Sequence, residues 1–144
     1  GNPFTREEPF FSKFQELMKY TDLLLVDIKH IDTECHKVLT GRSNENILDM
    51  IRYLSDIKKP IWIRHVLVPE RSDKDEYLTR LADFIHSLDN VEKVEILPYH
   101  TMGTYKYEQL GLDYPLKGVE PLSKERLDNA KAIFSRYKPE NNKA

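Results

Sequence analysis

The sequence predicts an α/β protein with three parallel strands in one sheet and helices packed against it. Three apolar segments begin at residues 22, 61 and 91, and helical patterns of apolar residues separate them. A connection between parallel strands needs a crossover of a dozen or more residues, which these spacings provide. The chain has 144 residues, 40% hydrophobic and 32% charged, as in an ordinary globular domain. We assign residues 1–138 to one domain and 139–144 to a polar tail.

The first expected elements are a helix over 9–20 and a strand over 22–28. The helix is predicted from apolar residues at helical spacing, and those expected to face inward are Phe10, Phe14, Leu17 and Met18. The strand reads DLLLVDI, a near-continuous apolar run that is typical of a parallel strand buried on both faces. As the first of three strands, however, it has an open edge, so we expect the chain to be part of a larger assembly.

The next helix is expected over 44–57, with Ser43 as its N-cap and one apolar stripe. The stripe consists of Ile47, Met50, Ile51, Leu54 and Ile57. The second strand, over 61–68, reads IWIRHVLV and is dense in β-branched and aromatic residues. A helix over 73–88 follows, where Ser72 and Asp75 have the spacing of a capping box.

The last elements are a strand over 91–97 and a helix over 123–137. The strand VEKVEIL alternates with polar residues, which indicates one less buried face. Ser123 can cap the helix, whose expected inward residues are Leu127, Ala130, Ile133 or Phe134, and Tyr137.

Composition excludes several classes of function. Lys and Arg total 22 against 24 Asp and Glu, so the balance gives no reason to expect nucleic acid as a partner. The longest apolar stretch, 23–26, is too short to span a membrane. Cys35 is the single cysteine, which rules out an internal disulfide or an iron–sulfur cluster held by this chain alone. A cytoplasmic location is the expectation.

Polar residues gather where the strands are expected to end. Asp27 and Lys29 end the first strand with their side chains on the same side, Arg64 lies in the second, and His100 follows the third. Ligands bind at the carboxyl ends of strands in parallel α/β folds, and this set suits a zwitterionic ligand. A strand-end ion pair without a ligand is an equal alternative for Asp27 and Lys29. No nucleophile, phosphate loop or metal cage is evident, so we name no catalytic or metal-binding residue.

Four segments carry a resemblance to a known family. They read VDIKHID, RHVLVPERSD, NVEKVEILPYHTMG and KYEQLGLDYPLKGVEP. In this order and spacing they resemble the C-terminal half of the pyruvate formate-lyase activating enzymes, which are radical S-adenosylmethionine enzymes, over roughly residues 1–137. The resemblance implies a partial (β/α)6 barrel, of which this chain supplies strands four, five and six.

The resemblance also implies residue roles and partners. Asp27, Ile28, Lys29, Arg64 and His100 match family positions that contact S-adenosylmethionine, and the aspartate can also hold a monovalent cation. Such enzymes cleave this cofactor reductively to a 5′-deoxyadenosyl radical, which removes a hydrogen atom from a glycine of pyruvate formate-lyase. Flavodoxin or ferredoxin is the expected electron donor.

The chain departs from the family in two respects that matter. The motif C-x3-C-x2-C, which holds the 4Fe-4S cluster, and the Gly-Gly-Glu element are both absent. The chain alone is therefore expected to be inactive, with its cluster ligands in the full-length parent. Glu70 stands where relatives usually have glycine, so the turn there is expected to differ.

Two other interpretations stay open. One is the activating enzyme of another glycyl radical enzyme, of the glycerol dehydratase or decarboxylase type. The other is a non-catalytic half-barrel that associates with itself through exposed strand edges.

Overall fold

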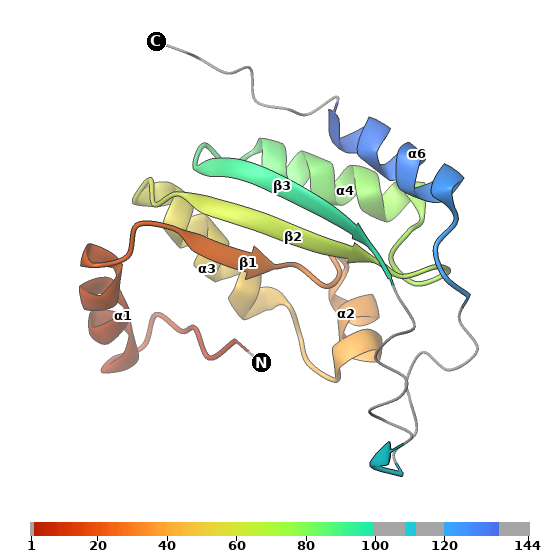
Figure 1. Cartoon of the computed structure of the whole chain (residues 1–144). Helices are drawn as coiled ribbons and strands as arrows, with labels where there is room; N and C mark the ends of the chain where they lie inside the picture. The colour runs from red at the N-terminus through yellow and green to blue at the C-terminus, as the bar shows by residue number, and fades with distance from the viewer. Residues whose placement is uncertain (1, 100–108, 112–119, 136–144) are drawn as a thin grey trace.

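The sheet consists of three parallel strands in the order β1-β2-β3, as the sequence predicts (Figure 1). The strands are β1 (Leu24–Asp27), β2 (Ile61–Leu67) and β3 (Val91–Pro98). The computed structural model describes residues 2–99, 109–111 and 120–135. The polar tail and the end of the expected domain lie outside these residues.

Helices cover one face of this sheet. They are α1 (Phe10–Lys19), α2 (Thr33–Thr40), α3 (Glu45–Asp56), α4 (Asp75–His86) and α6 (Lys124–Ser135). Figure 1 shows α3 and α4 behind the strands and α6 beside α4. Ile51 and Leu54 of α3 form a core with Ile61 and Ile63 of β2, and none of the four is accessible to solvent. Burying such side chains contributes about 1.5–3 kcal/mol each.

The other face of the sheet has no helix over it in the described part of the chain. Along β2, buried residues alternate with half-buried ones, which are Trp62, Arg64 and Val66. Leu25 of β1 is 55% exposed. The prediction that β1 is buried on both faces is therefore wrong, because helices pack against only one side of it here.

Two further sequence predictions are wrong in detail. Leu17 of α1 is 57% exposed, because Met18 takes the inward position at the end of that helix. Ser72 does not cap α4, which begins at Asp75 after Lys74. Its hydroxyl instead accepts from the Val68 N–H at 2.9 Å and donates to the Val66 carbonyl at 3.1 Å.

For two other helices, one predicted cap is confirmed and one is wrong. Ser123 accepts a hydrogen bond from the Arg126 N–H at 3.2 Å, which confirms it as a cap of α6. The N-cap of α3 is Asn44 rather than Ser43, and Ile57 lies beyond the end of that helix and is exposed. No helix among the described residues is long and apolar enough to cross a membrane.

Candidate binding site on the open sheet face

Charged side chains from all three strands lie side by side on the open face of the sheet. Asp27 pairs in register with Arg64, which pairs in register with Glu95, so the three side chains project from the same face. The Arg64 Nε lies 3.4 Å from a carboxylate oxygen of Glu95. This Nε is buried and has no hydrogen-bond partner within normal geometry. Arg64 is therefore ion-paired with Glu95, while its Nε–H still lacks a hydrogen bond.

Asp27 and Lys29 form an ion pair, with 3.2 Å between Nζ and Oδ2. Their side chains are 48% and 45% exposed, and a pair so exposed contributes at most about 1 kcal/mol. The ion pair itself is present in the structure, and it is compatible with both interpretations of these two residues. The pair is also weak enough to exchange for a ligand that brings its own charges.

Ile28 lies between these two residues, and both its N–H and its carbonyl are hydrogen-bonded. Its N–H donates to the Arg64 carbonyl at 3.0 Å, which extends the ladder by one residue beyond β1. Its carbonyl lies 2.6 Å from Nδ1 of His65, which must therefore donate. Burial lowers the pKa of His65 to about 4, so the ring is neutral near pH 7.

A second histidine holds the turn that follows β1. The Nε2 of His30 lies 3.0 Å from the Arg71 carbonyl, and its Nδ1 accepts from the Asp32 N–H at 3.0 Å. Burial lowers the pKa of His30 as well. Asn44 donates to the carbonyls of His30 and Ile31, at 3.0 and 2.9 Å. The turn after β1 is thus tied both to the turn after β2 and to the start of α3.

The turn after β2 contains the unusual Glu70. Its φ is +63°, a left-handed conformation that glycine adopts without strain. Its N–H donates to a carboxylate oxygen of Asp73 at 2.8 Å, which stabilises the turn. The side chain of Asp73 in turn lies 3.4 Å from Arg126 of α6.

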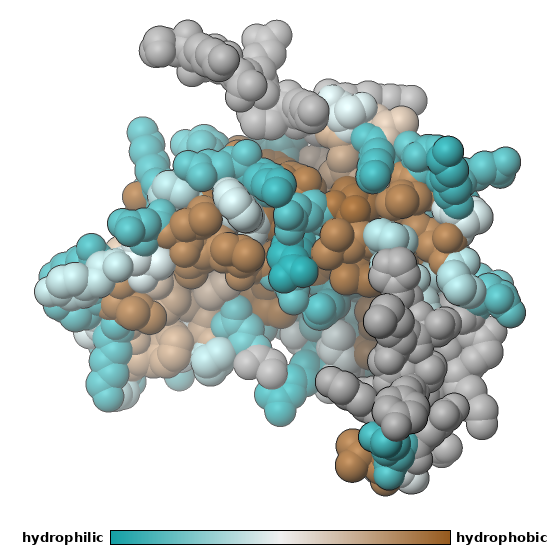
Figure 2. All heavy atoms as spheres, viewed as in Figure 1, coloured by the Kyte–Doolittle hydropathy of each residue, from teal (hydrophilic) through white to brown (hydrophobic). Residues whose placement is uncertain are grey.

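Apolar groups flank the charged residues on the open face. Figure 2 shows apolar surface on both sides of a polar band that crosses the sheet. Leu25 and Trp62 are register partners there, and the ammonium of Lys93 lies 4.8 Å from the centre of the Trp62 ring. The face therefore offers carboxylates, cations and an apolar floor. This combination suits a zwitterion with an apolar or aromatic part.

The structure brings together some of the predicted site residues. Asp27, Ile28, Lys29 and Arg64 meet at the carboxyl end of β1 and beside it, whereas His100 lies outside the described residues. His30 and His65 are both buried, and each holds the turn after β1 in place through a hydrogen bond. Ile63 and Leu67, two residues before and after His65, could have indicated its burial, because alternate residues of a strand lie on the same face.

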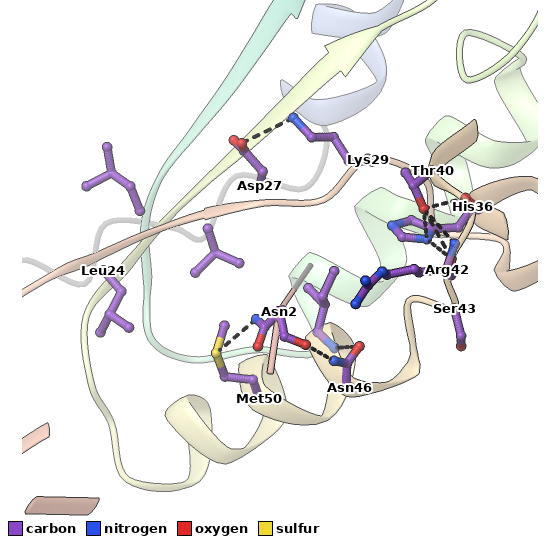
Figure 3. A pocket seen from close by; sticks show the side chains of 13 residues that line it. Asn2, Leu24, Asp27, Lys29, His36, Thr40, Arg42, Ser43, Asn46 and Met50 are labelled. Atoms are coloured by element: carbon purple, nitrogen blue, oxygen red, sulfur yellow. Dashed lines mark hydrogen bonds and ion pairs between the residues drawn. The ribbon is translucent and has the colours of Figure 1, made fainter. Parts of the chain in front are cut away.

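A pocket of about 710 Å³ lies next to this face, along the edge of β1. Figure 3 shows it between Asp27 and Lys29 on one side and Asn46 and Met50 of α3 on the other. Among the described residues, no group of three or more histidine, cysteine, aspartate or glutamate side chains could hold a metal ion.

Comparisons with known proteins agree on one kind of relative. A pyruvate formate-lyase-activating enzyme of Streptococcus mutans is 50% identical over 131 residues, which cover 91% of this chain and 50% of that protein. Enzymes of the same name from Listeria monocytogenes and Staphylococcus epidermidis are 49% and 54% identical, over 96% and 86% of this chain. No family model matches. The chain spans about half the length of these curated relatives.

The fold is also similar to that of solved structures. A crystal structure of a domain of pyruvate-formate lyase-activating enzyme from Bacteroides vulgatus matches with a TM-score of 0.72 and 25% identity. The match covers 88% of this chain and 69% of that one. A radical SAM methyltransferase from Sphaerobacter thermophilus has a TM-score of 0.56 at 17% identity, which supports the fold alone.

Proposed function

The chain is homologous to the pyruvate formate-lyase-activating enzymes over about half of their length, and from this premise we propose its function. It forms the S-adenosylmethionine-binding sheet face in the C-terminal half of such an enzyme. The full-length enzyme acts on pyruvate formate-lyase in the cytoplasm and receives electrons from flavodoxin or ferredoxin. The observation that carries the proposal is the alignment of Asp27, Arg64 and Glu95 across three strands, in which Arg64 is ion-paired with Glu95 but its Nε makes no hydrogen bond.

The side chains on the open face fit the methionine part of the cofactor. The carboxylate of this part can bind Arg64 and Lys29, and its ammonium group can bind Asp27, by charge-assisted hydrogen bonds. The Asp27–Lys29 ion pair opens in exchange. Ile28 keeps Asp27 and Lys29 in place, because both sides of its peptide are hydrogen-bonded.

The 4Fe-4S cluster does not fit on this chain. A 4Fe-4S cluster is bound by several cysteine thiolates, and Cys35 is the single cysteine of this chain. It lies 3.4 Å from the Tyr77 hydroxyl, away from the open face. In the full-length enzyme the cluster would supply the electron for reductive cleavage of S-adenosylmethionine, which would lead to a glycyl radical on the target. We propose that the 144 residues alone do not perform it.

The test uses a full-length fusion in which this chain replaces the matching 131 residues of the Streptococcus mutans relative. Arg64→Gln should raise the Kd for S-adenosylmethionine about 10-fold or more, because it removes a charge-assisted hydrogen bond. The matched control is Arg52→Gln, whose guanidinium lies 5.4 Å from the Phe84 ring on the other side of the sheet. Equilibrium dialysis under anaerobic conditions measures both variants.

Equal affinity in Arg64→Gln and in the unchanged fusion would contradict the proposed site. Glycyl radical formation, followed by electron paramagnetic resonance, tests the activity separately. Radical formation on a glycerol dehydratase but not on pyruvate formate-lyase would assign the protein to the alternative kind of activating enzyme.

A further inference from the structure

Charged side chains of alternating sign form a row across the open face of the sheet. From β1 to β3 the row consists of Lys29, Asp27, Arg64, Glu95 and Lys93. Lys29 pairs with Asp27, and Glu95 pairs with both Arg64 and Lys93. Asp27 and Arg64 are partners in register, yet among the described residues no ion pair joins them. The row therefore has a gap, which lies between a carboxylate and a guanidinium.

Glu95 is held in place from the far end of the row. Its Oε1 lies 2.9 Å from Nζ of Lys93, and this contact lowers the pKa of Glu95, so the carboxylate is charged near neutral pH. The ammonium of Lys93 in turn makes a cation–π contact with Trp62. The other carboxylate oxygen of Glu95 is the one that lies next to Arg64. Glu95 is thus fixed by a neighbour that takes no part in the gap.

Arg64 has a carboxylate on each side of it. Neighbouring strands lie about 4.8 Å apart, so Asp27 on β1 and Glu95 on β3 flank Arg64 at similar distances. The guanidinium pairs with Glu95, where its Nε is buried although 42% of the side chain is exposed. Without the charge of Glu95, Asp27 would be the remaining partner in register. An ion pair between Arg64 and Asp27 would close the gap, and each charge would then offset the other.

We infer that Glu95 is a positioning residue, which keeps the guanidinium of Arg64 away from Asp27. Arg64 and Asp27 then both remain available to one zwitterionic ligand that binds between them. Side chains that are already in place reduce the cost of ordering them when the ligand binds. The inference rests on the proposed function only for the identity of this ligand, S-adenosylmethionine.

Nuclear Overhauser effects from the Arg64 Nε–H in the chain alone test the positioning without any ligand. In the unchanged chain, the strongest contacts of this proton with a neighbouring acidic side chain should be those with Glu95. Glu95→Gln keeps the size of the side chain but removes its charge, and it should move these contacts to Asp27. The matched control is Glu92→Gln on the same strand, because Glu92 is exposed and has no ion pair among the described residues. The control should leave the contacts with Glu95 unchanged.

Equilibrium dialysis of the full-length fusion tests the consequence for binding. Glu95→Gln should raise the Kd for S-adenosylmethionine about 5-fold, because the ligand must first separate Arg64 from Asp27. Glu92→Gln should change the Kd by less than about 2-fold. In an Arg64→Gln background, Glu95→Gln should have no further effect, since its influence passes through Arg64. General damage to the sheet would instead weaken binding in either background.

Contacts that stay with residue 95 in Glu95→Gln would overturn the inference. So would an unchanged or lower Kd in this variant when Arg64→Gln raises the Kd, or a further rise in the double variant. A different result separates the proposed function from the inference. If the contacts move to Asp27 while Arg64→Gln leaves the affinity unchanged, the proposed function is refuted and the positioning role of Glu95 stands.

Discussion

His65 makes the stability of the protein depend on pH. Its pKa is about 4 in the folded protein, below its ordinary value of 6.5, because the ring is buried. The unfolded chain therefore binds a proton more readily. The stabilisation is complete above pH 6.5 and is lost as the pH falls towards 4, by roughly 3 kcal/mol at most. The lowered pKa of His30 acts in the same direction.

Urea unfolding at pH 7.5 and pH 5 measures this effect. The free energy of unfolding should fall by about 1–2 kcal/mol between the two values. His65→Gln should reduce that difference, and His86→Gln on the exposed side of α4 should not. An equal pH dependence in the His65 variant would show that the histidine is not responsible.

At the scale of elements, the helix α2 is the clearest omission from the sequence prediction. It has eight residues, of which only His36 is buried, so its apolar pattern is too weak to indicate a helix. Its ends do carry signals. Asp32 accepts from the Cys35 N–H at 3.0 Å, and Gly41 ends the helix with a φ of +77°. The longer helices were predictable because each buries a stripe of large apolar residues.

Asp32 should determine the stability of α2. The hydrogen bond from the Cys35 N–H, together with Arg80, lowers the pKa of Asp32 to about 2, so it is charged near neutral pH. Asp32→Ala should destabilise the protein by about 1 kcal/mol, because the first turn loses its cap. Asp32→Asn keeps a capping oxygen and should destabilise the protein by only a few tenths of a kcal/mol. Thermal unfolding of both variants is the measurement, and equal losses would mean that charge, not capping, matters.

At the scale of the whole molecule, strand order and direction could be predicted, but the exposure of each face could not. The apolar run of β1 indicates burial on both faces, yet burial depends on what lies opposite, and none of the described helices packs against Leu25. Similarly, the sequence places Asp27, Lys29 and Arg64 near one another because strand ends meet in a parallel sheet. The cross-strand contact with Glu95 depends on a register that contains an irregularity between Ile61 and Trp62.

The chain alone should associate with itself, because the open edge of β1 and the exposed Leu25 are available for pairing. Sedimentation velocity from about 1 to about 100 µM should show a sedimentation coefficient that rises with concentration. Leu25→Pro should lower this tendency more than Leu25→Ala, because proline also removes a backbone N–H that another strand could bind. A clean monomer over the whole range would contradict the expectation.

Hydrogen bonds of His30, His65 and Asn44 fix the turn after β1 against β2 and against the turn that follows β2. Residues fixed in this way have lost their backbone freedom on folding, before any ligand arrives. Association at Asp27 to Lys29 then costs little further conformational entropy, and affinity there depends on charge and fit. Nuclear relaxation should accordingly find these residues as rigid in the free protein as the centre of β2. The residues of the proposed S-adenosylmethionine site are thus ordered by the folding of the chain itself.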